Sequence, residues 1–191
     1  MPVLSLALLC LTPRAPATHY LVHRFADCPQ AAAYSAAHPA LGRFAYRVDA
    51  TLSHGNIWSA GAERFEARGG ARLFLSSAWI ELPRWSWSGM TTEQRNAYNA
   101  FVASLRDHEL GHATIAQSAI RGPVELTVLA RSRTQAEHAL HTALQQLLQT
   151  TSEELLRKER LYDRVTEHGK KQSEGPLYGF PGGNDVEFSC P

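Results

Sequence analysis

The segment His108-Glu109-Leu110-Gly111-His112 has the residue types and the spacing that bind a catalytic metal ion. Two histidines four residues apart lie one turn apart on the same face of a helix, so both imidazoles can reach a single zinc ion. Glu109 lies about 100° round the helix from His108, where it flanks the metal and can accept a proton from an attacking water. The pattern predicts a zinc site with His108 and His112 as ligands and Glu109 as general base.

Local signals define the helix that carries this motif. Thr91 and Gln94 form a capping-box pattern, which marks a helix start, and Gly122-Pro123 marks the end. One face of this helix holds residues at helical spacing: Tyr98, Phe101, Val102, Leu105, His108, His112, Ile115 and Ala119. A metal would satisfy two histidines on such a buried face. Gly111 between them suggests that another part of the backbone passes close to the site.

The order of secondary-structure signals predicts an α+β fold. The predicted strands are 19–23, 42–48 and a long run at 71–82, which is preceded by Gly69-Gly70 and stopped by Pro83. A short helix is expected at 29–38, and a second long helix from about Thr134 to Leu161. The expected fold is an N-terminal antiparallel β-rich part, followed by two long helices that include a zincin-like metal helix, and a loop-rich C-terminal tail.

Composition and apolar runs limit the classes of protein to consider. The chain has 191 residues and a formal net charge of +1, so electrostatics gives no argument for a nucleic-acid partner. No stretch approaches the ~20 apolar residues that span a bilayer, so no transmembrane segment is expected in the mature chain. An apolar run at 3–11 before Ala15-Pro16-Ala17 predicts a signal peptide at 1–17, the alternative being a buried N-terminal strand or helix. The catalytic domain is expected at 18–172 and an irregular tail at 173–191.

The cysteines are consistent with export. If Cys10 leaves with the signal peptide, Cys28 and Cys190 remain as an even pair near the two ends of the mature chain. In an oxidising compartment they could form one disulfide, and the alternative is two free thiols. No CxxC pair occurs, which makes cysteine a poor candidate for metal binding. The expected location is periplasmic or secreted.

Two patches of the sequence carry a resemblance to a known family. The first is Leu82-Pro83-Arg84-Trp85 followed by His108-Glu109-x-x-His112, and the second is Tyr162-Asp163-x-x-Thr166-x-His168-Gly169 with Gln172 just beyond. In these patches the chain resembles a bacterial family of predicted secreted zinc-dependent proteases, described mainly as a domain of unknown function. The resemblance covers about residues 20–172. It implies periplasmic or secreted zinc chemistry and supplies no substrate.

A third zinc ligand must come from a segment distant from the histidine pair, because catalytic zinc usually keeps three protein ligands and one open position. Ile115 and Ser118 stand where an extended motif would place glycine and histidine. Within the second patch His168 is the predicted third ligand, since imidazole is a common zinc donor and Gly169 allows close approach. Carboxylates that qualify by residue type alone are Glu125, Glu137, Glu153 and Glu154.

Two further residues of this patch have predicted roles. Asp163 is the alternative third ligand, or else it orients a metal-bound histidine. The Tyr162 hydroxyl is predicted to donate a hydrogen bond to the oxyanion that develops during the reaction. Together these residues predict a zinc-dependent metallopeptidase that acts on a peptide or protein. The alternative is a zinc-binding, non-catalytic exported protein, which Glu109 disfavours because a purely structural site has no need of a general base.

Overall fold

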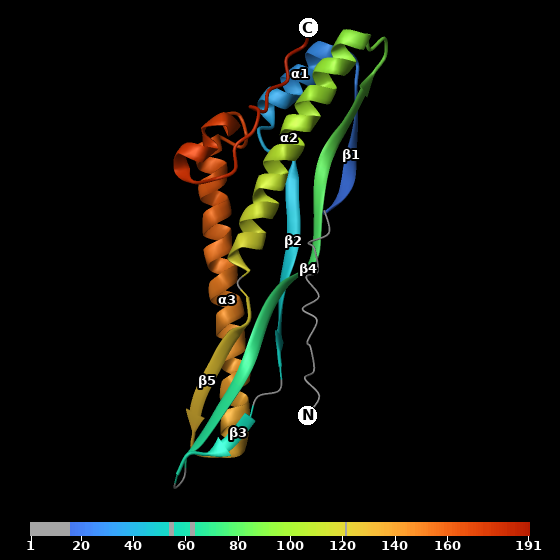
Figure 1. Cartoon of the computed structure of the whole chain (residues 1–191). Helices are drawn as coiled ribbons and strands as arrows, with labels where there is room; N and C mark the ends of the chain where they lie inside the picture. The colour runs from blue at the N-terminus through green and yellow to red at the C-terminus, as the bar shows by residue number, and fades with distance from the viewer. Residues whose placement is uncertain (1–15, 54–55, 62–63, 121) are drawn as a thin grey trace, which may run out of the picture.

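A long central strand forms the spine of the molecule (Figure 1). The computed structural model describes residues 16–53, 56–61, 64–120 and 122–191. The predicted signal peptide therefore lies outside the described residues, apart from its last two positions. The fold is α+β, as predicted: most of the strands precede the two long helices, and one strand lies between the helices. Among the described residues, no helix has the length and apolarity needed to cross a membrane.

All other strands of the five-stranded sheet pair with the central strand, β4. The strands are β1 (Ala17–Phe25), β2 (Arg43–Leu52), β3 (Asn56–Ser59), β4 (Phe65–Trp87) and β5 (Val124–Ala130). β2, β3 and β5 run antiparallel to β4, whereas β1 runs parallel to its C-terminal part. The antiparallel expectation therefore holds for three of the four pairings, and β3 and β5 were not predicted as strands.

The central strand runs further in both directions than the predicted 71–82. Pro83 does not stop it, because β2 begins opposite Glu81 and therefore has no residue opposite Pro83 on that edge. The Tyr98 hydroxyl takes over at this edge: it donates to the Pro83 carbonyl and accepts from the Trp85 N–H. This contact fixes the N-terminal part of the metal helix against the sheet.

The helices are α1 (Cys28–Ala37), α2 (Thr92–Ala119), α3 (Arg133–Thr166) and the 3-10 segment η1 (Gln172–Tyr178). The capping box at Thr91 and Gln94 is present, as predicted. α3 continues five residues beyond the predicted end and stops only where Glu167 adopts the left-handed conformation. The C-terminal half of α2 lies beside the C-terminal end of α3 (Figure 1).

The C-terminal tail is irregular, as expected, but it is part of the core. After η1 the chain returns along α2 toward α1 (Figure 1). Val186 and Phe188 are buried in the same apolar cluster as Trp85 and Phe101. The tail ends at a disulfide between Cys28 and Cys190, the pair that the cysteine count suggested. These contacts anchor the segment that follows α3.

Candidate metal centre

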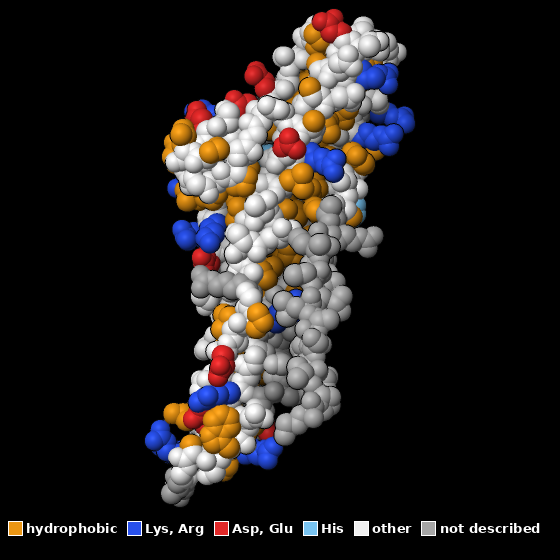
Figure 2. Space-filling model, in the orientation of Figure 1, with side chains coloured by type: hydrophobic (Ala, Val, Ile, Leu, Met, Phe, Trp, Pro, Cys, Tyr) orange, Lys and Arg blue, Asp and Glu red, His pale blue; other side chains and the backbone are white. Residues whose placement is uncertain are grey.

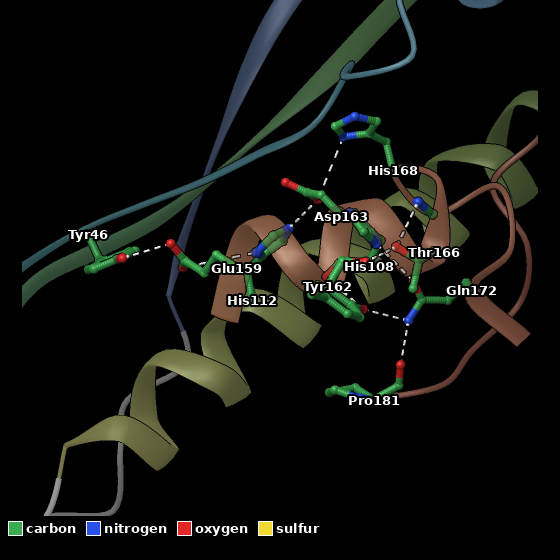
Figure 3. Close-up of polar contacts among 11 residues, drawn as sticks. Tyr46, His108, His112, Glu159, Tyr162, Asp163, Thr166, His168, Gln172 and Pro181 are labelled. Carbon is green, nitrogen blue, oxygen red and sulfur yellow. Dashed lines mark hydrogen bonds and ion pairs between the residues drawn. The ribbon is translucent and has the colours of Figure 1, made fainter. Parts of the chain in front are cut away.

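Three side chains from two helices converge on one point. His108 and His112 come from α2, Asp163 comes from α3, and their candidate ligand atoms all lie within 4.8 Å of one another. The Asp163 Oδ1 atom is 3.2 Å from His108 Nε2 and 3.0 Å from His112 Nε2. Both histidines are buried and Asp163 is half-buried. Figure 3 shows the three side chains pointing toward one another.

Gln172, which lies behind His108, selects the tautomer of the neutral His108 ring. The Pro181 carbonyl can only accept hydrogen bonds, so the Gln172 Nε2 group must face it, at 2.9 Å. This orientation directs Gln172 Oε1 at His108 Nδ1, 2.8 Å away, and only a protonated Nδ1 can donate there. In the neutral ring Nε2 then carries a lone pair that faces Asp163. His108 Nε2 and Asp163 Oδ1 would then both be acceptors, 3.2 Å apart, and would need a proton or a cation between them. Two such lone pairs directed at one point are what a metal ion binds.

Tyr162 supports both histidines from beneath. Its ring stacks on His108 with centroids 4.9 Å apart and meets His112 edge-on. Its hydroxyl accepts a hydrogen bond of 2.6 Å from Gln172 Nε2 and donates to the His108 carbonyl at 3.4 Å. A side chain on Gly111 would collide with this hydroxyl, so the close neighbour at Gly111 is the Tyr162 side chain and not the backbone segment that was predicted. The glycine is required for this packing.

The predicted oxyanion role of Tyr162 does not fit this arrangement. The side chain is fully buried and is not among the residues that line the pocket over the site. Burial raises its pKa to about 12, so the hydroxyl stays protonated and its hydrogen bonds remain internal. Tyr162 therefore positions the histidines instead of contacting a substrate.

A second carboxylate, Glu159, lies on the far side of His112. One of its oxygens is 4.0 Å from His112 Nδ1, and the other accepts a hydrogen bond of 2.8 Å from the Tyr46 hydroxyl. Burial raises the pKa of Glu159, although the Tyr46 hydrogen bond opposes this. For His112, burial lowers the pKa, but the hydrogen bond to Asp163 and the charge of that carboxylate raise it overall.

Asp163 is held in its ionised form. Burial alone would raise its pKa, but the adjacent imidazoles of His108 and His112 keep the pKa well below its usual range. An ionised carboxylate beside two imidazole nitrogens is a suitable donor set for zinc. The residues present therefore fit a zinc ion, with His108, His112 and Asp163 as the groups that would hold it.

Glu109, the predicted general base, faces the same pocket. Its side chain is buried, and the nearby Phe44 backbone favours the ionised form of its carboxylate. Gly42 leaves room for this carboxylate, because a side chain at position 42 would overlap Glu109 Oε1. Burial raises the pKa of Glu109 above its ordinary value, which moves it toward the range useful to a general base near neutral pH.

The pocket above these residues is formed mainly by three parts of the chain, and His168, beyond the end of α3, also lines it. The segment 39–44 that leads into β2 forms one wall, α2 contributes His108, Glu109 and His112, and α3 contributes residues from Leu156 to Asp163. Its volume is about 200 Å³. The three candidate ligands lie on its inner side, so a metal held there would be accessible from the pocket.

The structure corrects the choice of third ligand. His168 is not part of the converging group: its imidazole is 47% exposed, and its Nδ1 is 3.7 Å from Asp163 Oδ1. Figure 3 shows His168 contacting Asp163 and standing apart from the histidine pair. The physical reason is that α3 continues through Asp163 to Thr166, which turns Asp163 toward α2. Glu167 and His168 then adopt the left-handed conformation and carry the chain outward, so that His168 lines the pocket instead.

Two supporting residues were missed by sequence reasoning. Glu159 lies four residues before Asp163 on α3, so a helix extended through Asp163 would have placed both on one face. Gln172 belongs to the second sequence patch, but no local pattern shows that its amide reaches His108, 64 positions away.

Comparison with known proteins gives one result. The sequence pattern of a family described as "Bacterial protein of unknown function (DUF922)" matches residues 74–169. The match includes the histidine pair, Glu109, Asp163 and His168, and it stops before Gln172. No curated protein and no solved structure matches the chain.

Proposed function

The chain belongs to this bacterial family of unknown function, and from its own residues we propose that it is a zinc-dependent hydrolase that cleaves peptide bonds. One observation carries the proposal: Gln172 holds His108 in the tautomer that directs a lone pair at the point shared with His112 and Asp163. Two imidazoles and one carboxylate, with an open pocket on one side, match the ligand set of catalytic zinc.

The residues of the chain divide the chemistry among them. Zinc bound here would polarise the carbonyl of the scissile amide and make water a better nucleophile. Glu109, adjacent to His108 and open to the pocket, takes the proton from the attacking water and returns it to the leaving amine. Gln172, Tyr162 and Glu159 keep the two imidazoles in position.

The pocket-lining His168 has a role in this proposal other than metal binding. Its exposed imidazole lies on the outer side of Asp163 and faces the pocket that a substrate would enter. In its protonated form it can donate a hydrogen bond to the carbonyl oxygen of a bound substrate, the role that had been predicted for Tyr162.

Export is part of the proposal. A disulfide between Cys28 and Cys190 is typical of proteins that fold in an oxidising compartment. Together with the predicted signal peptide at 1–17, it supports a periplasmic or secreted enzyme.

The test compares wild-type protein with the Glu109→Gln variant. Both, purified without a histidine tag, should contain about one zinc per chain, because Glu109 is not a ligand. Wild type should cleave members of a broad peptide library and lose this activity when a chelator removes the metal, whereas Glu109→Gln should be at least about 100-fold slower. Zinc-loaded wild type that cleaves no peptide would support the non-catalytic alternative, and a variant as active as wild type would remove Glu109 from the mechanism.

A further inference from the structure

Two arginines at the metal pocket form no ion pair with another residue that the structure describes. Arg43 lines the pocket from the start of β2, and Arg160 lines it from α3. Within the described parts of the chain, neither guanidinium forms an ion pair, although Glu109, Glu159 and Asp163 line the same pocket. The arginines therefore do not neutralise these carboxylates through ion pairs, and both side chains are exposed.

The basic character continues from the pocket along α3. Arg157, Arg160 and Arg164 are spaced by three and four residues and so follow one face of the helix. All three are exposed, and none is ion-paired to another described residue: Glu167, next to this stripe, pairs with Lys171 at 2.7 Å. Figure 2 shows basic and hydrophobic side chains gathered over the upper part of α3.

A shallow groove on α3 joins this stripe to the metal pocket. It is lined by the three arginines together with Leu156, Leu161 and Glu153. Leu156 and Arg160 line both the groove and the metal pocket, so the two are continuous. Leu156 and Leu161 are 46% and 37% exposed, so the groove also presents apolar surface. The surface thus offers three guanidinium groups and two apolar side chains, with one carboxylate, Glu153, at its N-terminal end.

We propose that this basic groove (Arg157, Arg160, Arg164, Leu156 and Leu161) binds an acidic peptide and makes acidic polypeptides the substrate class of the metal site. Guanidinium groups bind carboxylates through paired hydrogen bonds, and the two leucines fit the apolar side chains between acidic residues. With Arg43 across the pocket, carboxylates on both sides of the scissile amide find a partner. The inference rests on the proposed hydrolase function for its substrate, but the groove itself is tested by binding alone.

The experiment uses zinc-loaded Glu109→Gln protein, in which binding is observed without cleavage. Two fluorescent peptides of equal length and equal apolar content are compared by anisotropy, one with Asp and Glu and the other with Asn and Gln at the same positions. Each exposed Arg–carboxylate pair contributes about two- to fivefold in affinity, so three pairs should make the acidic peptide bind roughly tenfold or more tightly. The difference should shrink in high salt, which screens exposed charges.

Variants then locate the binding surface. Arg160→Gln should lower the affinity for the acidic peptide about two- to fivefold, and the triple substitution Arg157→Gln, Arg160→Gln, Arg164→Gln should remove the preference. Arg95→Gln, an exposed arginine on α2 that lines neither pocket, is the matched control and should change nothing.

The outcomes separate this inference from the proposed function. Equal affinity for the two peptides, or a loss of affinity in Arg95→Gln as large as in Arg160→Gln, would overturn the acidic-peptide inference whether or not the wild type cleaves peptides. Binding of anionic lipid vesicles in place of the acidic peptide would overturn it as well. A tenfold preference in a protein whose wild type cleaves neither peptide would leave the groove established and refute the hydrolase proposal instead.

Discussion

Replacing Gln172 by leucine tests the hydrogen bond between Gln172 and His108 that orients the proposed zinc ligand. The substitution removes the acceptor for His108 Nδ1–H and the donor to Tyr162 and Pro181, in a position with no solvent exposure. Loss of a residue that orients a metal-bound histidine typically lowers metal affinity about 10- to 100-fold. Leaving buried polar groups without partners costs a further ~1–3 kcal/mol in the free energy of unfolding.

Gln172→Glu separates these two effects. A carboxylate still accepts from His108 Nδ1–H and from the Tyr162 hydroxyl, but it cannot donate to the Pro181 carbonyl. Zinc affinity should therefore stay within about threefold of wild type or rise, because a carboxylate increases the basicity of its histidine. Stability should still fall, because the Pro181 carbonyl loses its partner.

Competition with a chromophoric chelator measures the affinity, and chemical denaturation of the metal-free protein measures the stability. Gln117→Leu, at an exposed position on the same helix as the histidines, is the control and should change neither quantity. If Gln172→Leu binds zinc within about twofold of wild type, the argument that this amide selects the His108 tautomer is wrong.

Two further substitutions test packing around the site. Gly111→Ala should destabilise the fold by ~1–3 kcal/mol through its collision with the Tyr162 hydroxyl, despite the better helix propensity of alanine; Gly122→Ala, which meets no neighbour within 4 Å, should be near neutral in the same denaturation experiment. Cys28→Ser with Cys190→Ser should lower stability by ~2–5 kcal/mol, as should reduction of the wild type, and an unchanged melting temperature would show that the tail is not held by the disulfide.

The parts of the fold that could be predicted depend on local signals. α2 was placed correctly because its cap, Thr91 with Gln94, and its buried face are both readable within the helix itself. β4 was cut short because Gly69-Gly70 and Pro83 read as strand ends. In the structure Gly69 lies where a side chain would crowd Leu140, so the glycine permits close packing of α3 on the sheet.

The motif residues of the site could be predicted from the sequence, but the third candidate ligand could not. His108, Glu109 and His112 follow from helix geometry alone. Asp163 and His168 are five residues apart, and the choice between them depends on where α3 ends, a boundary that Glu167 sets through a left-handed conformation unusual for a non-glycine residue. Donor type favoured His168, but the continued helix turned Asp163 toward the histidine pair.

The zinc content of matched ligand variants tests the account most directly. Untagged wild type, Asp163→Ala and His168→Ala are each dialysed against a weak chelator and measured by elemental analysis. The proposed site predicts about one zinc per chain in wild type and in His168→Ala, and little or none in Asp163→Ala, because Asp163 and not His168 shares the point on which His108 and His112 converge. A wild type that folds but takes up no zinc, or a His168→Ala variant that loses zinc while Asp163→Ala keeps it, would contradict this metal centre.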